Sequence, residues 1–94
     1  MLAPTPPGAP EPTPPTIYTT SWCGYCARLK YTLDAAEVLY LEVDIGAVPA
    51  AADIVTAANN GNRTVPTVVY ADGTTMTNPG AGRVQAKLAE LAAA

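Results

Sequence analysis

The stretch that decides the fold is Thr16–Cys26, which reads TIYTTSWCGYC. Its first part, Thr16–Thr20, is rich in β-branched and aromatic side chains, which favour a short strand. Helical spacing begins at Tyr25 and puts Cys26 on the apolar face. The pair Cys23 and Cys26 therefore lies where a strand ends and a helix begins. That setting, more than the spacing alone, is typical of a redox-active cysteine pair.

The two cysteines are predicted to have different roles. Residues three apart at the start of a helix have Cα atoms roughly 5 Å apart, which a disulfide tolerates. Cys23 precedes the first turn, where free N–H groups and the helix dipole favour a thiolate. Cys26 lies one turn further on and should be shielded. The chain has no histidine to act as a base, so Arg28 and Lys30 are the nearest groups that could add to the effect of the helix terminus. We expect Cys23 to be the attacking nucleophile and Cys26 the resolving thiol.

A structural role and a metal-binding role are the alternatives for these cysteines. A single cysteine on an apolar helix face is more often an inert part of the core. A Cys-x-x-Cys pair is also half of a zinc site, but the chain has no further cysteine and no histidine to complete it. Only a dimer that bridges the ion could do so. We therefore favour the redox interpretation and expect no metal site.

The rest of the chain predicts an α/β fold. A second strand is expected at Tyr40–Asp44, and a helix that begins near Pro49 is expected to end at Asn59–Asn62. A hairpin turn at Ala71–Gly73 is expected to join strands Thr67–Tyr70 and Thr74–Thr77, before a last helix with Asn78 as its N-cap and Pro79 at its first position. The order is β-α-β-α-β-β-α. One mixed four-stranded sheet with helices on both faces accounts for every element.

Composition limits the domain organisation and the partners. The chain has 94 residues and ten prolines, and seven of these prolines lie in residues 1–15. We expect that segment to be a disordered extension, followed by one domain over residues 16–94. No apolar run is long enough to span a membrane, and no secretory signal is present, so a cytoplasmic monomer is expected. The net charge is −3 with five scattered basic residues, which argues against nucleic-acid binding.

Residues near the cysteines are candidates for substrate binding. Thr64, Val65 and Pro66 precede the third strand, and this loop is expected to face Cys23 and to offer the Val65 backbone to an extended substrate. An ordinary turn proline is the alternative. Thr77 and Asn78 are expected at a helix N-terminus with free backbone donors, or act only as a cap. Trp22 and Tyr25 flank the nucleophile and either stack on substrate or shield the site.

The site sequence resembles that of glutaredoxins. The residues that carry the resemblance are Cys23-Gly24-Tyr25-Cys26, followed by Arg28 and Lys30. A glycine in place of the usual proline, the preceding Trp22 and the stretch Asn62–Val68 are similar to mycoredoxins, the glutaredoxin-like proteins of actinobacteria. The resemblance covers residues 16 to about 91 and leaves the proline-rich segment outside it.

The resemblance implies a thioredoxin fold, a cis Pro66 and a glutaredoxin-like domain over residues 16–94. It implies reduction of mixed disulfides between proteins and mycothiol, a sugar–inositol thiol. Mycothiol would be the reducing co-substrate, S-mycothiolated proteins the partners, and no cofactor would be tightly bound. Glutaredoxins usually hold the charged end of glutathione with a Gly-Gly and an Asp near the last helix, whereas Asn78–Gly82 contains no Asp. The buried carboxylate that thioredoxins carry on the first strand is also missing.

Two further functions remain open. A thioredoxin-like protein-disulfide reductase would take electrons directly from a flavoprotein and supply them to a reductase such as ribonucleotide reductase. An iron–sulfur carrier would use Cys23 from two chains to bridge a cluster.

Overall fold

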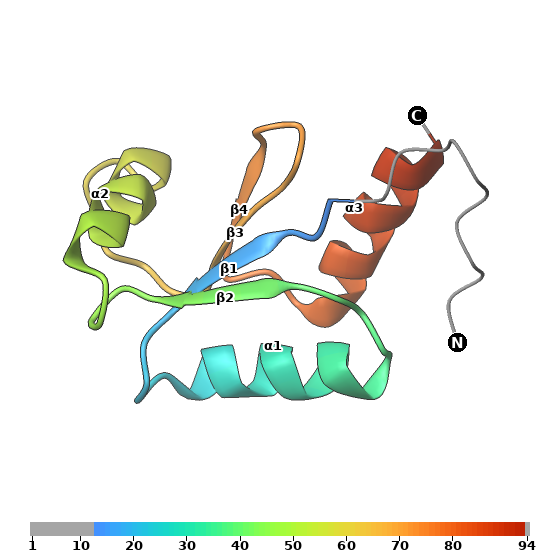
Figure 1. Ribbon diagram of the computed structural model, residues 1–94, viewed down its shortest axis with the longest axis horizontal. Coiled ribbons are helices and arrows are strands. Elements are labelled where there is room, and N and C mark those ends of the chain that lie inside the picture. Colours follow the sequence, from blue (N-terminus) through green and yellow to red (C-terminus); the bar gives the residue numbers. More distant parts are fainter. Residues whose placement is uncertain (1–12, 94) are drawn as a thin grey trace.

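The computed structural model describes residues 13–93. Its elements follow the predicted order (Figure 1). Their bounds are β1 (Thr16–Thr19), α1 (Gly24–Ala35), β2 (Leu41–Asp44), α2 (Pro49–Ala58), β3 (Thr67–Val69), β4 (Thr75–Thr77) and α3 (Ala81–Ala93).

The four strands form one mixed sheet in the order β2-β1-β3-β4. Strand β1 pairs in parallel with β2, with Thr16 opposite Leu41, and α1 makes the crossover between them. Strand β3 runs antiparallel to both β1 and β4. The β3–β4 turn contains Gly73 at φ +85°, which glycine adopts without the clash that a Cβ would bring. The predicted hairpin and the predicted mixed sheet are confirmed.

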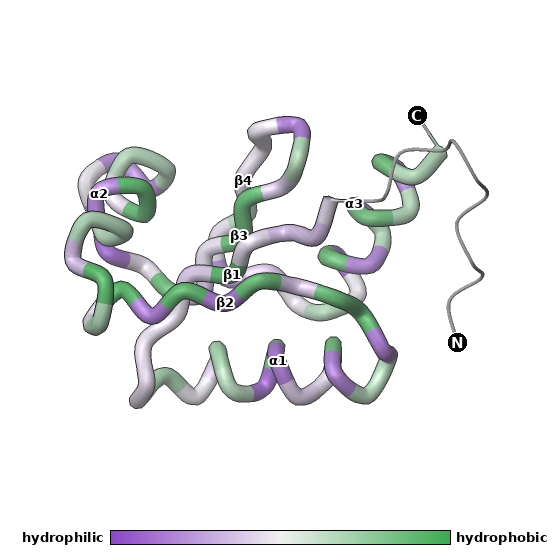
Figure 2. The backbone as a smooth tube through the Cα atoms, viewed as in Figure 1, coloured by the Kyte–Doolittle hydropathy of each residue, from purple (hydrophilic) through white to green (hydrophobic). Residues whose placement is uncertain are grey.

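Hydrophobic residues pack on both faces of the sheet. Successive side chains of a strand point to opposite faces, so Ile17 joins a cluster with Leu33 of α1 and Val84 of α3, whereas Tyr18 joins Val55 of α2. Figure 1 shows α1 and α2 on opposite sides of the strands, and Figure 2 shows hydrophobic and hydrophilic residues interleaved along α3. Each fully buried side chain of this size contributes about 1.5–3 kcal/mol. The prediction of helices on both faces is confirmed.

The last helix begins later than predicted. Asn78 is not its N-cap and Pro79 is not its first residue, because α3 starts at Ala81. Asn78 has φ +46°, and its N–H donates to the Pro66 carbonyl oxygen at 2.7 Å. Asparagine tolerates this left-handed conformation better than most residues. The Gly80 carbonyl oxygen accepts the first helical hydrogen bond, from Val84 at 3.3 Å.

The fold includes the residue before β1. Pro15 is buried, and its carbonyl oxygen accepts a hydrogen bond from the Leu41 N–H at 2.9 Å. Most of the predicted disordered extension, residues 1–12, lies outside the described residues. Between residues 13 and 93, no helix is long and apolar enough to cross a membrane.

Candidate active site

Cys23 is the N-cap of α1. Its backbone is extended, at φ −89° and ψ 114°, and its carbonyl oxygen accepts the first helical hydrogen bond, from Ala27. The Cys26 N–H donates to Cys23 Sγ at 3.2 Å. An N-cap side chain normally satisfies a free N–H with an oxygen, and here a sulfur does so. The partly exposed Cys23 sulfur therefore lies at the positive end of the helix dipole, next to a backbone donor.

Cys26 has the opposite environment. It is 1% exposed and lies on the buried face of α1 together with Leu29 and Leu33. Burial, followed by the hydrogen bond to Cys23, raises the pKa of the Cys26 thiol to about 12. The Thr20 backbone and the Lys30 charge act in the other direction. At neutral pH Cys26 is therefore a protonated thiol, and both cysteines are free in this structure.

The loop before β3 faces the nucleophile. The Val65–Pro66 peptide bond is cis, and Cys23 Sγ–H donates to the Val65 carbonyl oxygen at 3.8 Å. The predictions that Pro66 is cis and that this loop lies against Cys23 are both confirmed. The Val65 side chain packs against the cluster that contains Val55 of α2, so the loop rests on the core.

The candidate binding residues divide into two groups. Trp22 and Tyr25 are 82% and 66% exposed beside Cys23. Thr64 and Thr77 take part in bonds within the fold. The Thr64 carbonyl oxygen accepts from Thr67 Oγ1, and the Thr77 hydroxyl donates to the side-chain oxygen of Asn59. The side chains of Trp22 and Tyr25 are therefore accessible to a ligand, whereas Thr64 and Thr77 help to hold the region of β3.

Tyr25 and Asn78 line one open groove of about 510 Å³, although they are far apart in the sequence. Its wall on α1 is made by residues spaced along one helix face, and its other wall is the loop before α3: Tyr25, Arg28, Leu29, Thr32 and Asn78–Gly82. Arg28 is the one charged side chain among the described residues that line it. Sequence reasoning missed this role of Thr32, although the spacing of Tyr25, Arg28 and Thr32 along α1 would have indicated it.

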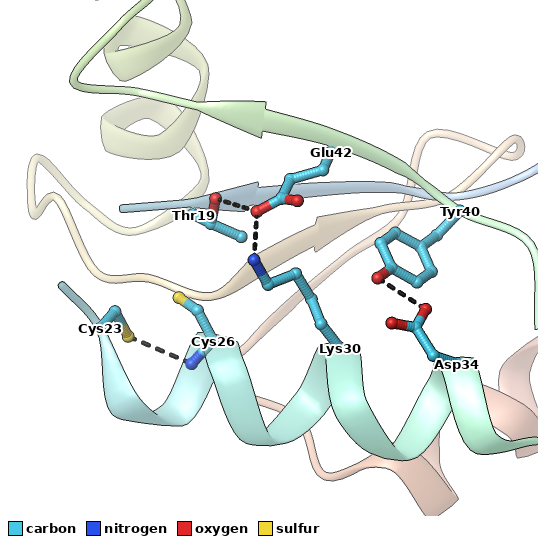
Figure 3. Close-up of polar contacts among 7 residues, drawn as sticks. All are labelled: Thr19, Cys23, Cys26, Lys30, Asp34, Tyr40 and Glu42. Atoms are coloured by element: carbon cyan, nitrogen blue, oxygen red, sulfur yellow. Dashed lines mark hydrogen bonds and ion pairs between the residues drawn. The ribbon is translucent and has the colours of Figure 1, made fainter. Parts of the chain in front are cut away.

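Sequence reasoning also missed a polar cluster beside Cys26. Glu42 Oε2 accepts from Lys30 Nζ at 2.7 Å and from Thr19 Oγ1 at 2.8 Å. Figure 3 shows Cys26 and Lys30 projecting from α1 toward the sheet, where Thr19 and Glu42 meet the Lys30 ammonium group. The first strand has no carboxylate, as noted from the sequence, but Glu42 on the neighbouring strand β2 supplies one to this cluster.

Comparisons with known proteins agree with this geometry. The glutaredoxin family model matches residues 16–75. The chain belongs to the glutaredoxin family. A Mycobacterium tuberculosis protein described as a glutaredoxin is 61% identical over 77 residues, 82% of this chain and 92% of that protein. Mycoredoxin 1 of Corynebacterium glutamicum is 48% identical over 77 residues, again 82% of this chain, and 95% of its own length.

A solved structure supports the same assignment of fold. The holo form of glutaredoxin C1 from Populus tremula x tremuloides superposes with a TM-score of 0.56 at 26% identity, over 79% of this chain and 72% of that one. The protein is a mycoredoxin-like glutaredoxin with a thioredoxin fold, and its class is thiol–disulfide oxidoreductase. The resemblance seen in the sequence is confirmed at this level.

Proposed function

We propose that this glutaredoxin reduces mixed disulfides between proteins and mycothiol, with Cys23 as nucleophile and Cys26 as resolving thiol. The observation that carries the division of roles is the difference between the two sulfurs. Cys23 is partly exposed and accepts a backbone N–H, whereas Cys26 is 1% exposed. An incoming disulfide can therefore reach Cys23 and not Cys26.

In the proposed cycle, the Cys23 thiolate attacks the mycothiol sulfur of the mixed disulfide. The S–S bond to the target protein breaks, and the target leaves as a thiolate that takes up a proton. A second mycothiol, as thiolate, then attacks the mycothiol sulfur held on Cys23 and forms mycothiol disulfide, so that Cys23 is released. Cys26 offers a second exit by attacking Cys23 itself. The electrons come from mycothiol in the first route and from the Cys23–Cys26 dithiol in the second.

The choice of mycothiol over glutathione is supported by the charge of the groove that Tyr25, two residues after Cys23, helps to line. Glutathione carries two carboxylates, whereas mycothiol carries none. Among the described residues that line the groove, Arg28 is the one charged side chain, and the loop Asn78–Gly82 has no acidic residue to hold an amino group. A groove of this kind fits a neutral polar thiol better than a zwitterionic peptide. The 48% identity to a protein named mycoredoxin favours the same choice.

The test uses one target protein with a single cysteine, loaded with either mycothiol or glutathione. We expect the mycothiol adduct to be reduced with at least tenfold higher kcat/KM when each reaction is supplied with its own thiol. Equal rates, or faster reduction of the glutathione adduct, would overturn the choice of thiol. A reductase of the thioredoxin type would instead work with a flavoprotein alone and need neither thiol.

Variants of the two cysteines test the division of roles. Cys23→Ser should abolish reduction of the mixed disulfide, because no other described thiol is accessible. Cys26→Ser should retain much of it and lose the reduction of disulfides within a protein, which requires two thiols. Retained turnover in Cys23→Ser would refute the assignment. The cytoplasmic location and the monomeric state expected from the sequence stay predictions.

A further inference from the structure

The buried position of Cys26 creates an electrostatic problem. To resolve an intermediate, Cys26 must become a thiolate, and it must leave as a thiolate whenever the Cys23–Cys26 disulfide is reduced. Burial disfavours a charged sulfur, and at 1% exposure water gives it little solvation. A thiolate here needs a compensating group within the protein.

Lys30 is the cation placed to compensate. It lies four residues after Cys26 on α1, and residues at this spacing are neighbours on one helix face. Figure 3 shows both side chains on the side of α1 that faces the sheet. The Lys30 charge lowers the pKa of Cys26, and Cys26 in turn raises the pKa of Lys30.

Glu42 holds the Lys30 ammonium group in this place. The 2.7 Å ion pair to Glu42 Oε2 joins α1 to β2, and the hydroxyl of Thr19, itself 1% exposed, donates to the same oxygen. The hydrogen bond from Lys30, followed by that from Thr19, lowers the pKa of the Glu42 carboxyl. Glu42 is therefore a poor base for Cys26, and its effect is to place the lysine and to offset part of its charge.

Two further carboxylates affect the Lys30–Glu42 ion pair and, through it, Cys26. Asp34, one turn beyond Lys30 on α1, adds to the negative field at Lys30 and is itself bound by the Tyr40 hydroxyl at 2.9 Å. Asp44 on β2 lies two residues from Glu42 and raises its pKa against the lysine. On Cys26 itself, Cys23 and Lys30 are the titratable groups with the largest effects.

We propose that Lys30, positioned by Glu42, supplies the positive charge that stabilises Cys26 as a thiolate in the steps that use the second cysteine. The inference rests on the proposed resolving role of Cys26, and not on the identity of the small thiol. In the resolving step, Cys26 first gives its proton to water. The Cys26 thiolate attacks Cys23 Sγ, the new S–S bond forms, and the bond from Cys23 to the carried thiol breaks. The carried thiol leaves as a thiolate and takes up a proton.

A single absorbance measurement separates the resolving step of Cys26 from the first attack by Cys23. The reduced full chain is mixed with excess dithiodipyridine, an uncharged aromatic disulfide. Cys23 releases one coloured thiopyridone, and Cys26 then releases the second by attacking the adduct on Cys23. Stopped-flow absorbance gives both rates, and their ratio is followed as a function of pH. The Cys26→Ser variant must lose the second phase, and if it does not, the resolving role itself fails.

The Lys30→Met and Glu42→Gln variants should move the second phase in opposite directions. A unit charge on a partly exposed lysine one helical turn away changes a thiol pKa by about one unit. A higher pKa leaves less Cys26 thiolate, but the more basic thiolate is also more nucleophilic, which offsets about half of the loss on a logarithmic scale. Lys30→Met should therefore slow the second phase roughly three- to fourfold relative to the first. Glu42→Gln keeps an oxygen that can accept from Lys30 and Thr19 but removes its negative charge. It should therefore accelerate the second phase.

Two control variants complete the design. Lys30→Arg keeps the charge and should stay within twofold of the parent chain. Lys87→Met breaks another lysine–carboxylate pair, with Asp72 at 3.0 Å, and should leave the ratio of the phases unchanged. A merely structural ion pair predicts that Lys30→Met and Glu42→Gln change the ratio in the same direction. That result, or an unchanged ratio in Lys30→Met, would overturn the proposal.

Discussion

The clearest quantitative consequence of the site concerns the reactivity of Cys26 alone. In the Cys23→Ser variant, Cys26 is the one thiol in the chain, so its reaction with dithiodipyridine can be measured directly. Burial, the largest cause of the raised pKa, remains in this variant. The comparison is between the folded chain at pH 7 and the same chain unfolded in urea.

The magnitude follows from the raised pKa. Burial and the neighbouring Cys23 raise the pKa of Cys26 from 9.0 to about 12, and three units correspond to about a thousandfold less thiolate at pH 7. A more basic thiolate is also a better nucleophile, so with a Brønsted coefficient of about 0.4–0.5 the full shift would slow the reaction roughly 30- to 60-fold. The Cys23→Ser variant keeps the part of this shift that comes from burial and loses the part that comes from the Cys23 sulfur. The 1% exposure of Cys26 adds a steric barrier, so the folded variant should react at least about tenfold more slowly than the unfolded one.

The assay has an internal reference and a clear contrary result. The rate in urea reports an ordinary thiol in the same sequence, and far-UV circular dichroism of the variant without urea confirms that it is folded. A folded rate within threefold of the unfolded rate would mean that Cys26 is accessible and ionisable. The division of roles between Cys23 and Cys26 would then have no physical basis.

Two further predictions concern stability. Leu33→Ala should lower the free energy of unfolding by about 2–5 kcal/mol, because Leu33 is fully buried between α1 and the sheet. Urea denaturation measures this loss, and a loss below about 1 kcal/mol would contradict the packing. Acid should destabilise the fold in part through Glu42, whose pKa is lowered in the folded chain mainly by the Lys30 hydrogen bond. Its contribution is therefore present above the ordinary pKa of 4.5 and lost as pH falls through the folded pKa. Glu42→Gln should flatten the acid limb of the stability profile, and an unchanged limb would show that the ion pair adds nothing.

The strand–turn–helix around Cys23 could be predicted because its determinants are local. A β-branched run, a break at the first cysteine and a change to helical period occupy eleven adjacent residues, Thr16–Cys26. The cis Pro66 and its place beside Cys23 came from the resemblance to glutaredoxins and from the predicted strand order. In both cases the structure agrees. Local patterns and a parallel β-α-β unit were therefore sufficient to predict where the nucleophile Cys23 lies.

The start of α3 could not be predicted from local patterns. Asn78-Pro79 is a typical N-cap and first-turn pair, but Asn78 instead donates its N–H to Pro66 from another part of the chain. This tertiary hydrogen bond and the φ of +46° exclude it from the cap position. The resulting loop forms one wall of the groove that Tyr25 also lines. The wrong helix boundary therefore falls within the candidate binding surface.

The Lys30–Glu42 ion pair could not be predicted for a related reason, and it helps to explain why the two cysteines differ. The bond joins residues 12 apart, and the Thr19–Glu42 bond joins residues 23 apart, so neither has a signature in a sequence window. Yet the Lys30–Glu42 bond depends on the period of α1, which places Cys26 and Lys30 on one face. A helix with Cys23 as its N-cap thus gives the first sulfur a backbone donor, buries the second, and brings a lysine beside the buried one. If the Lys30 variants behave as expected, the reactivity of both cysteines follows from where this single helix begins.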